Sequence, residues 1–177
     1  MSDPAFEGSY VAVTGAGMCG LWQAEHFEHV TSLNAWEDEV SEDEALASHV
    51  RKGAFVPLNV GGDGCFRVTI REGGRNAREK RYTLVSSDPY LLVSRGTLML
   101  GGLENVGSYI GGAQQIAFPA GRHLVKVHLL DWKAEPGSVG ADGSPTGIAL
   151  PDFLVEIHPE PDGFVAFRST VRTFERS

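Results

Sequence analysis

The chain has 177 residues and a formal net charge of −8 at pH 7, with 15 Lys and Arg against 23 Asp and Glu. That length predicts one globular domain over residues 1–177, and the sequence leaves its oligomeric state open. The acidic balance argues against nucleic acid as a partner and against docking on an anionic membrane, because both need a basic surface. No apolar stretch reaches the roughly 18 to 20 residues of a membrane span, and the acidic start lacks a signal-peptide pattern. We therefore predict a cytoplasmic protein.

The first third of the sequence predicts one strand and two helical segments. Residues 9–14 have the β-branched and aromatic composition of a strand. Residues 21–28 form a weak helical candidate. The stronger helix is expected from about residue 41 to residue 52, where Ser41 and Glu44 fit a capping box and acids fill the first turn, as the helix dipole favours.

The remaining two thirds predict short strands separated by glycine turns. Glycine makes up 22 of the 177 residues, and its pairs fall between runs rich in Val, Leu, Ile, Phe and Tyr, which is typical of hairpins. Because no long helical crossovers separate these runs, we expect antiparallel pairing. The predicted fold class is mainly β: an antiparallel two-sheet sandwich or a flattened barrel with one short acidic helix. The predicted strands are 54–60, 65–71, 81–86, 90–94, 97–100, 114–118, 123–132, 148–158 and 164–167.

Two predicted strands near the carboxyl end bring possible metal ligands together. The odd positions of 123–132 and of 148–158 are apolar over most of their length and should face the core. If the strands are antiparallel neighbours, His128, Glu156 and His158 share the opposite face. Two imidazoles and a carboxylate can bind Zn or Fe. They form the candidate metal site, and a solvated cross-strand pairing is the structural alternative.

A glycine motif follows the first predicted strand. Gly15, Gly17 and Gly20 have the Gly-x-Gly-x-x-Gly spacing of a dinucleotide-binding loop. That loop needs a parallel sheet with alternating helices, and the downstream pattern has glycine turns instead. We therefore predict a strand corner at residues 15–20 and no bound cofactor.

Other possible catalytic or metal-binding groups lack partners in the sequence. His26 and His29 lie three residues apart and could share a helix face, as half of a metal site. The chain has neither a Gly-x-Ser-x-Gly elbow nor a Ser-x-x-Lys motif. We predict no catalytic residue.

The densest charge cluster lies at the start of the predicted acidic helix. Six acids fall between positions 37 and 44, with a tryptophan beside them. A dense patch of one sign speeds the encounter with an oppositely charged partner, whereas a solvated helix start is the structural alternative. We predict a docking surface for a basic protein, formed by Trp36, Glu37, Asp38, Glu39, Glu42, Asp43 and Glu44.

The carboxyl-terminal pattern resembles a known group of proteins. Residues 118–128 read FPAGRHLVKVH, and residues 152–161 read DFLVEIHPEP after a loop rich in Gly and Pro. These two segments are similar to the closing hairpin of small bacterial β-proteins, some of them grouped with the immunity proteins of polymorphic toxin systems. The resemblance implies no catalytic residue. We expect a non-enzymatic protein-binding module of the immunity or inhibitor kind, and the alternative is a β-barrel protein that binds a metal or small ligand through its His/Glu site.

Overall fold

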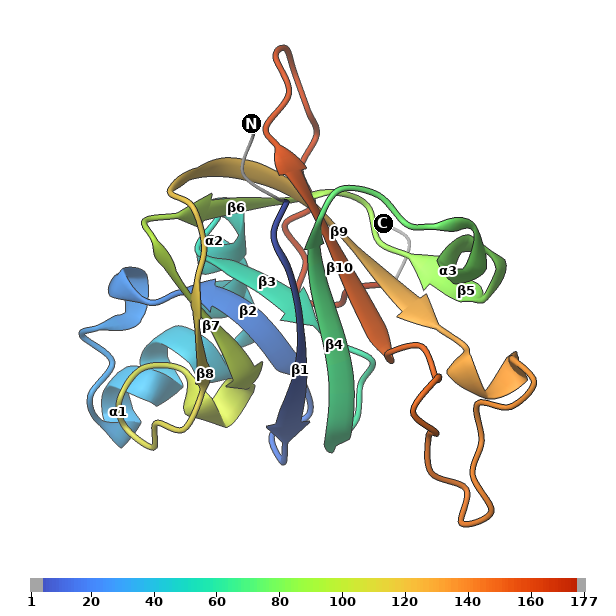
Figure 1. Ribbon diagram of the computed structural model, residues 1–177. Helices are drawn as coiled ribbons and strands as arrows, with labels where there is room; N and C mark the ends of the chain where they lie inside the picture. Colours follow the sequence, from blue (N-terminus) through green and yellow to red (C-terminus); the bar gives the residue numbers. More distant parts are fainter. Residues whose placement is uncertain (1–4, 175–177) are drawn as a thin grey trace.

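The structure is a computed structural model that describes residues 5–174 and contains two packed β-sheets (Figure 1). The strands are β1 (Glu7–Thr14), β2 (Cys19–Gln23), β3 (Phe55–Leu58), β4 (Gly64–Glu72), β5 (Thr83–Ser86), β6 (Tyr90–Ser94), β7 (Thr97–Gly102), β8 (Gln114–Ala117), β9 (Gly121–Leu130) and β10 (Phe153–Pro159). The larger sheet has the order β1-β4-β10-β9-β5, and β6 also pairs with β9; the smaller has the order β3-β2-β7-β8. The mainly β fold with two sheets is confirmed, and the described strands form no closed barrel.

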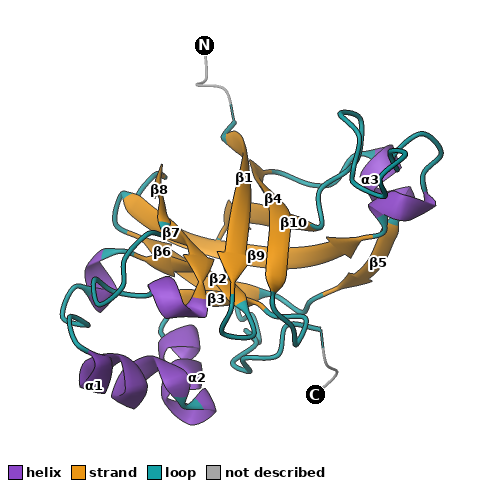
Figure 2. Cartoon of the chain, turned by 90° about the horizontal axis from the view of Figure 1, so that it is seen from below, coloured by secondary structure: helices purple, strands orange, loops and turns teal. Residues whose placement is uncertain are grey.

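The helical segments gather at two ends of the sheets (Figure 2). One group lies between β2 and β3 in the chain, with α2 packed against β3 and β6. It consists of η1 (Glu25–Phe27), α1 (Leu33–Trp36), the π-helical turn η2 (Glu37–Ser41) and α2 (Asp43–Arg51). The short η3 (Leu103–Asn105) lies beside this group, since Leu103 accepts a hydrogen bond from Trp36, and the other helices are α3 (Ala77–Arg81) and η4 (Trp132–Ala134). The chain is therefore more helical than the single predicted acidic helix. No helix of residues 5–174 is long and apolar enough to cross a bilayer.

The expected pairing of the last two long strands is confirmed. β9 and β10 run antiparallel, and Val127 lies opposite Val155 in the register. Both residues are fully buried between the sheets, because the odd positions of these strands face the core. The even positions, including Lys126 and Glu156, lie on the outer face of the larger sheet. The smaller sheet contributes Trp22 stacked on Phe55, with ring centroids 5.9 Å apart.

One strand pair departs from the predicted antiparallel arrangement. β10 inserts between β9 and β4, and it runs parallel to β4 with Val155 opposite Ile70. A parallel pair needs a long crossover, and here the crossover contains five strands together with α3 and two short 3-10 helices. The predicted pattern missed this pair because it considered only helical crossovers.

Several predicted elements are wrong in detail. The helical candidate at residues 21–28 is replaced by β2, whose five residues are all buried, followed by the short η1. The expected strand at 164–167 has no strand pairing. The basic residues before β5 form α3, where Asn76 and Glu79 make a capping box.

The start of the acidic helix also differs from the expectation. Helix α2 begins at Asp43, and Glu42 occupies its N-cap position without a side-chain cap hydrogen bond. Ser41 donates its hydroxyl to the Glu37 carbonyl oxygen at 2.7 Å. Because the π-helical turn brings that carbonyl within reach, Ser41 does not form the predicted capping box with Glu44.

Candidate functional site

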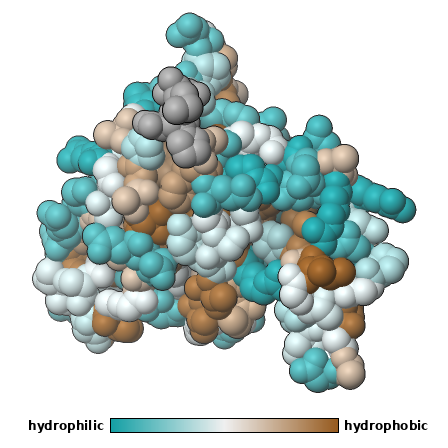
Figure 3. Space-filling view, viewed as in Figure 1, coloured by the Kyte–Doolittle hydropathy of each residue, from teal (hydrophilic) through white to brown (hydrophobic). Residues whose placement is uncertain are grey.

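The acidic segment, residues 36–44, presents most of its carboxylates to solvent. Glu37, Asp38, Glu42, Asp43 and Glu44 are exposed. Within residues 5–174 none of these five carboxylates forms an ion pair with a basic side chain. The region around α1 is mainly hydrophilic to neutral in the space-filling view (Figure 3). The segment thus carries five exposed carboxylates without an ion-pair partner in the described chain.

The acidic segment is nevertheless fixed to the core. Trp36 is half-buried, and its indole N–H donates to the Leu103 carbonyl oxygen at 3.1 Å. Val40, Leu46 and Val50 are fully buried among residues of both sheets. A half-buried indole that packs against the core and has a satisfied N–H anchors its segment. Trp36 therefore holds the segment in place, and the exposed carboxylates stand on a rigid support.

The sixth acid of the segment belongs to a histidine cluster. Glu39 forms an ion pair with His29, and it lies 3.7 Å from Nε2 of the buried His49. Nδ1 of His49 is 2.8 Å from Nε2 of His26. Burial lowers the pKa of both His26 and His49, with a further contribution from Lys52 and against the opposing effect of Glu39. The structure thus pairs His26 with His49, and not with His29 as the spacing suggested.

The glycine motif forms a corner between the two sheets. It connects β1 of the larger sheet to β2 of the smaller one, and no helix follows it. Its amides are bound by carboxylates of this chain: Gly15 donates to Glu104 at 3.1 Å and Gly17 donates to Asp63 at 2.7 Å. A phosphate would need those same donors and would be repelled by those acids. This geometry does not resemble a dinucleotide-binding loop.

The three predicted metal ligands meet around one carboxylate. Glu156 Oε1 lies 3.1 Å from Nε2 of His128, and its Oε2 lies 2.8 Å from Nε2 of His158. Ser86 Oγ approaches the other ring nitrogen of His128 at 2.6 Å. Each of these polar atoms therefore has a partner within the protein. Among residues 5–174 no group of three or more His, Cys, Asp or Glu has the arrangement of a metal site.

Burial and charge set the protonation of this cluster. Burial acts to raise the pKa of Glu156, but hydrogen bonds from His158 and His128 outweigh it and hold that pKa below the ordinary value. The pKa of His128 is lowered, first by burial and then by the charge of Arg75. Arg75 Nε lies 4.0 Å from Glu156 Oε1. An ionised Glu156 beside a neutral His128 is the expected state at neutral pH.

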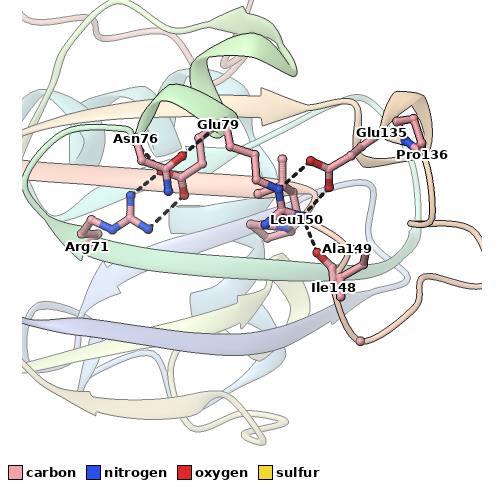
Figure 4. A pocket seen from close by; sticks show the side chains of 11 residues that line it. Arg71, Asn76, Glu79, Glu135, Pro136, Ile148, Ala149 and Leu150 are labelled. Carbon is pink, nitrogen blue, oxygen red and sulfur yellow. Dashed lines mark hydrogen bonds and ion pairs between the residues drawn. The ribbon is translucent and has the colours of Figure 1, made fainter.

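A pocket of about 600 Å³ lies between α3 and the loop that precedes β10 (Figure 4). Arg71 forks onto the buried Glu79 carboxylate at 2.6 and 2.9 Å. Arg78 reaches across to Glu135 and to the Ile148 carbonyl oxygen. The charged groups drawn in this pocket are paired with one another: Arg71 joins β4 to α3, and Arg78 fastens the loop to α3.

Two groups of the outer face were missed by sequence reasoning. The capping box of Asn76 and Glu79 has a readable signal, an Asn followed three residues later by a Glu. Ser86 has none, because it meets His128 only through the pairing of β5 with β9. A contact made by strand register is invisible in the local sequence.

The fold is similar to that of solved structures, although no family model and no curated protein matches the chain. A structure described as "Crocagin biosynthetic gene J" has a TM-score of 0.55 and 19% identity, covering 91% of this chain and 100% of that one. ComJ from Bacillus subtilis, described as an inhibitor of the DNA degrading activity of NucA, has a TM-score of 0.49 and 6% identity, covering 89% and 98%. At 19% identity the likeness to the first of these structures concerns the fold alone.

Proposed function

We propose that this chain is a protein-binding module that docks a basic partner through the acidic segment. An inhibitor or immunity protein that covers a basic surface is the kind of module that suits such a segment. The supporting observation is the set of five exposed carboxylates without an ion-pair partner in residues 5–174. Their field extends into solvent, where it can steer a cation-rich protein toward the surface.

The rigidity of the segment strengthens this proposal. Trp36 and the buried side chains of α2 fix the backbone that carries the carboxylates. A preorganised surface loses less conformational entropy when it binds than a flexible acidic tail does. The surface can therefore be specific for the arrangement of charges on its partner as well as for their sign.

The test compares two double variants with equal changes in net charge. Glu37→Gln with Asp38→Asn removes two charges from the segment, and Asp142→Asn with Asp162→Asn removes two exposed charges elsewhere. A partner is isolated with the wild-type chain and its association rate is measured. We expect the first pair to slow association about 10-fold at low salt, with the difference fading as salt screens the charges. Equal rates for both double variants would contradict the proposal.

A further inference from the structure

A second set of groups, on the outer face of the larger sheet, is arranged for covalent chemistry. Ser86 is exposed on the edge strand β5, and the strand register places it opposite His128 of β9. Its Oγ lies 2.6 Å from His128 Nδ1. His128 is held in turn, because its Nε2 lies 3.1 Å from Glu156 Oε1. A chain of hydrogen bonds thus connects a nucleophile, a base and a group that orients the base.

The direction of the hydrogen bonds follows from the carboxylate. An ionised Glu156 can only accept, so the ring proton of a neutral His128 lies on Nε2. Nδ1 is then an acceptor, and Ser86 donates its hydroxyl proton to it. His158 donates to the second oxygen of the same carboxylate at 2.8 Å, which holds Glu156 in place. The His128 side chain is only 2% exposed, whereas Ser86 is open to solvent.

We propose that Ser86 is an activated nucleophile that accepts acyl groups from carboxylic esters, with His128 as its general base and Glu156 as the group that orients His128. The Ser86 oxygen forms a bond to the ester carbonyl carbon while its proton moves to Nδ1 of His128. The ester C–O bond then breaks, and the leaving alkoxide takes that proton and departs as an alcohol. Water, deprotonated by His128, attacks the acyl-serine, and the carboxylic acid leaves as the hydroxyl proton returns to Ser86.

Positive charge lies near the carboxylate and the base, since Arg75 Nε is 4.0 Å from Glu156 Oε1. The Arg75 guanidinium donates to Thr83 Oγ1 of β5 at 3.0 Å, and its buried Nε has no hydrogen-bond partner. The same positive charge favours the neutral form of His128, which is the form that can act as a base.

The charges around His128 predict a particular pH dependence. The groups that face it are Glu156 and His158 from β10, Arg75 from the segment before α3, Lys126 from its own strand, and Ser86 from β5. Burial and Arg75 keep the pKa of His128 below its ordinary value of 6.5. Reactivity should therefore rise as His128 loses its proton and level off by about pH 7. An ordinary serine would instead keep gaining reactivity with hydroxide concentration.

The experiment treats the full chain with a fluorophosphonate and locates the adduct by mass spectrometry. The serine oxygen bonds to phosphorus, fluoride leaves, and the serine proton is taken up by His128. We expect one adduct, on Ser86, and labelling that disappears in Ser86→Ala. Ser9→Ala is the matched control, because Ser9 is also an exposed strand serine with a side-chain hydrogen bond. It should label like the wild type.

A further variant tests the role of the carboxylate. Glu156→Gln keeps the size of the side chain but can stabilise the wrong tautomer of His128, so labelling should slow by a factor of about 100. The wild-type chain should also release p-nitrophenol from p-nitrophenyl acetate in a burst equal to one acyl group per chain. Labelling of Ser9 as fast as of Ser86, or a rate that climbs steadily through pH 9, would overturn the proposal.

Discussion

The acidic segment and the outer face of the larger sheet are both rich in charge, but they use it in opposite ways. In the acidic segment five carboxylates are exposed and unpaired among the described residues. On the sheet face, Glu79 is only 3% exposed and is bound by Arg71, and Glu156 is bound by two histidines. Removing one partner of an internally paired charge destabilises the fold, whereas charge left facing solvent remains available to another molecule.

The largest expected effect comes from removing one partner of a buried ion pair on the outer face of the larger sheet. Arg71→Met removes the guanidinium that forks onto the buried Glu79 at 2.6 and 2.9 Å. The carboxylate would remain buried without its countercharge, which costs about 3 to 5 kcal/mol. We expect a loss of that size in the free energy of unfolding, measured by urea denaturation.

A matched control separates this effect from the loss of any arginine. Arg122 forms a similar forked pair with Glu160, but Arg122 is exposed to solvent. Arg122→Met should therefore produce no measurable change in the urea midpoint. If both variants lost the same stability, the distinction between buried and exposed pairing would be wrong.

A medium effect is expected beside the acidic segment, at the buried His49, whose Nε2 lies 3.7 Å from Glu39. Its pKa is lowered by burial and by the charges of His26 and Lys52, against the opposing effect of Glu39. His49 of the unfolded chain takes up a proton near pH 6.5, whereas the buried His49 of the folded chain stays neutral to a lower pH. The contribution of neutral His49 to the free energy of unfolding is therefore present in full above pH 6.5, and it is lost as the pH falls toward the pKa of His49 in the folded chain. The slope approaches about 1.4 kcal/mol per pH unit for this one proton.

The slope of unfolding free energy against pH, from pH 7 to pH 5, checks that expectation. His49→Gln cannot take up the proton, so its slope should be smaller than that of the wild type. His29→Gln is the control, because His29 bonds the same Glu39 but is 58% exposed. A wild-type slope in His49→Gln would show that other groups carry the acid sensitivity.

The sequence predicts which side chains of a strand face the core better than it predicts which side chains of different strands meet. Alternating apolar residues place Val127 and Val155 in the core and Glu156 outside, because strand geometry has a period of two. The same rule correctly placed His128, Glu156 and His158 on one face. It could not show that Ser86 joins them, since that depends on which strand pairs with β9. Nor could it show β10 beside β4, because those strands are distant in the chain.

The smallest expected effect concerns the unpaired carboxylates of the acidic segment. Glu37→Gln with Asp38→Asn removes two exposed charges that have no ion-pair partner in the described chain, so the free energy of unfolding should change by less than about 0.5 kcal/mol. Any change should be toward higher stability, because the neighbouring acids repel each other less. Urea denaturation of the double variant measures this directly. If the same variant that slows association leaves stability unchanged, its charges serve a partner; if it lowers stability markedly, the acids support α1 and η2 instead.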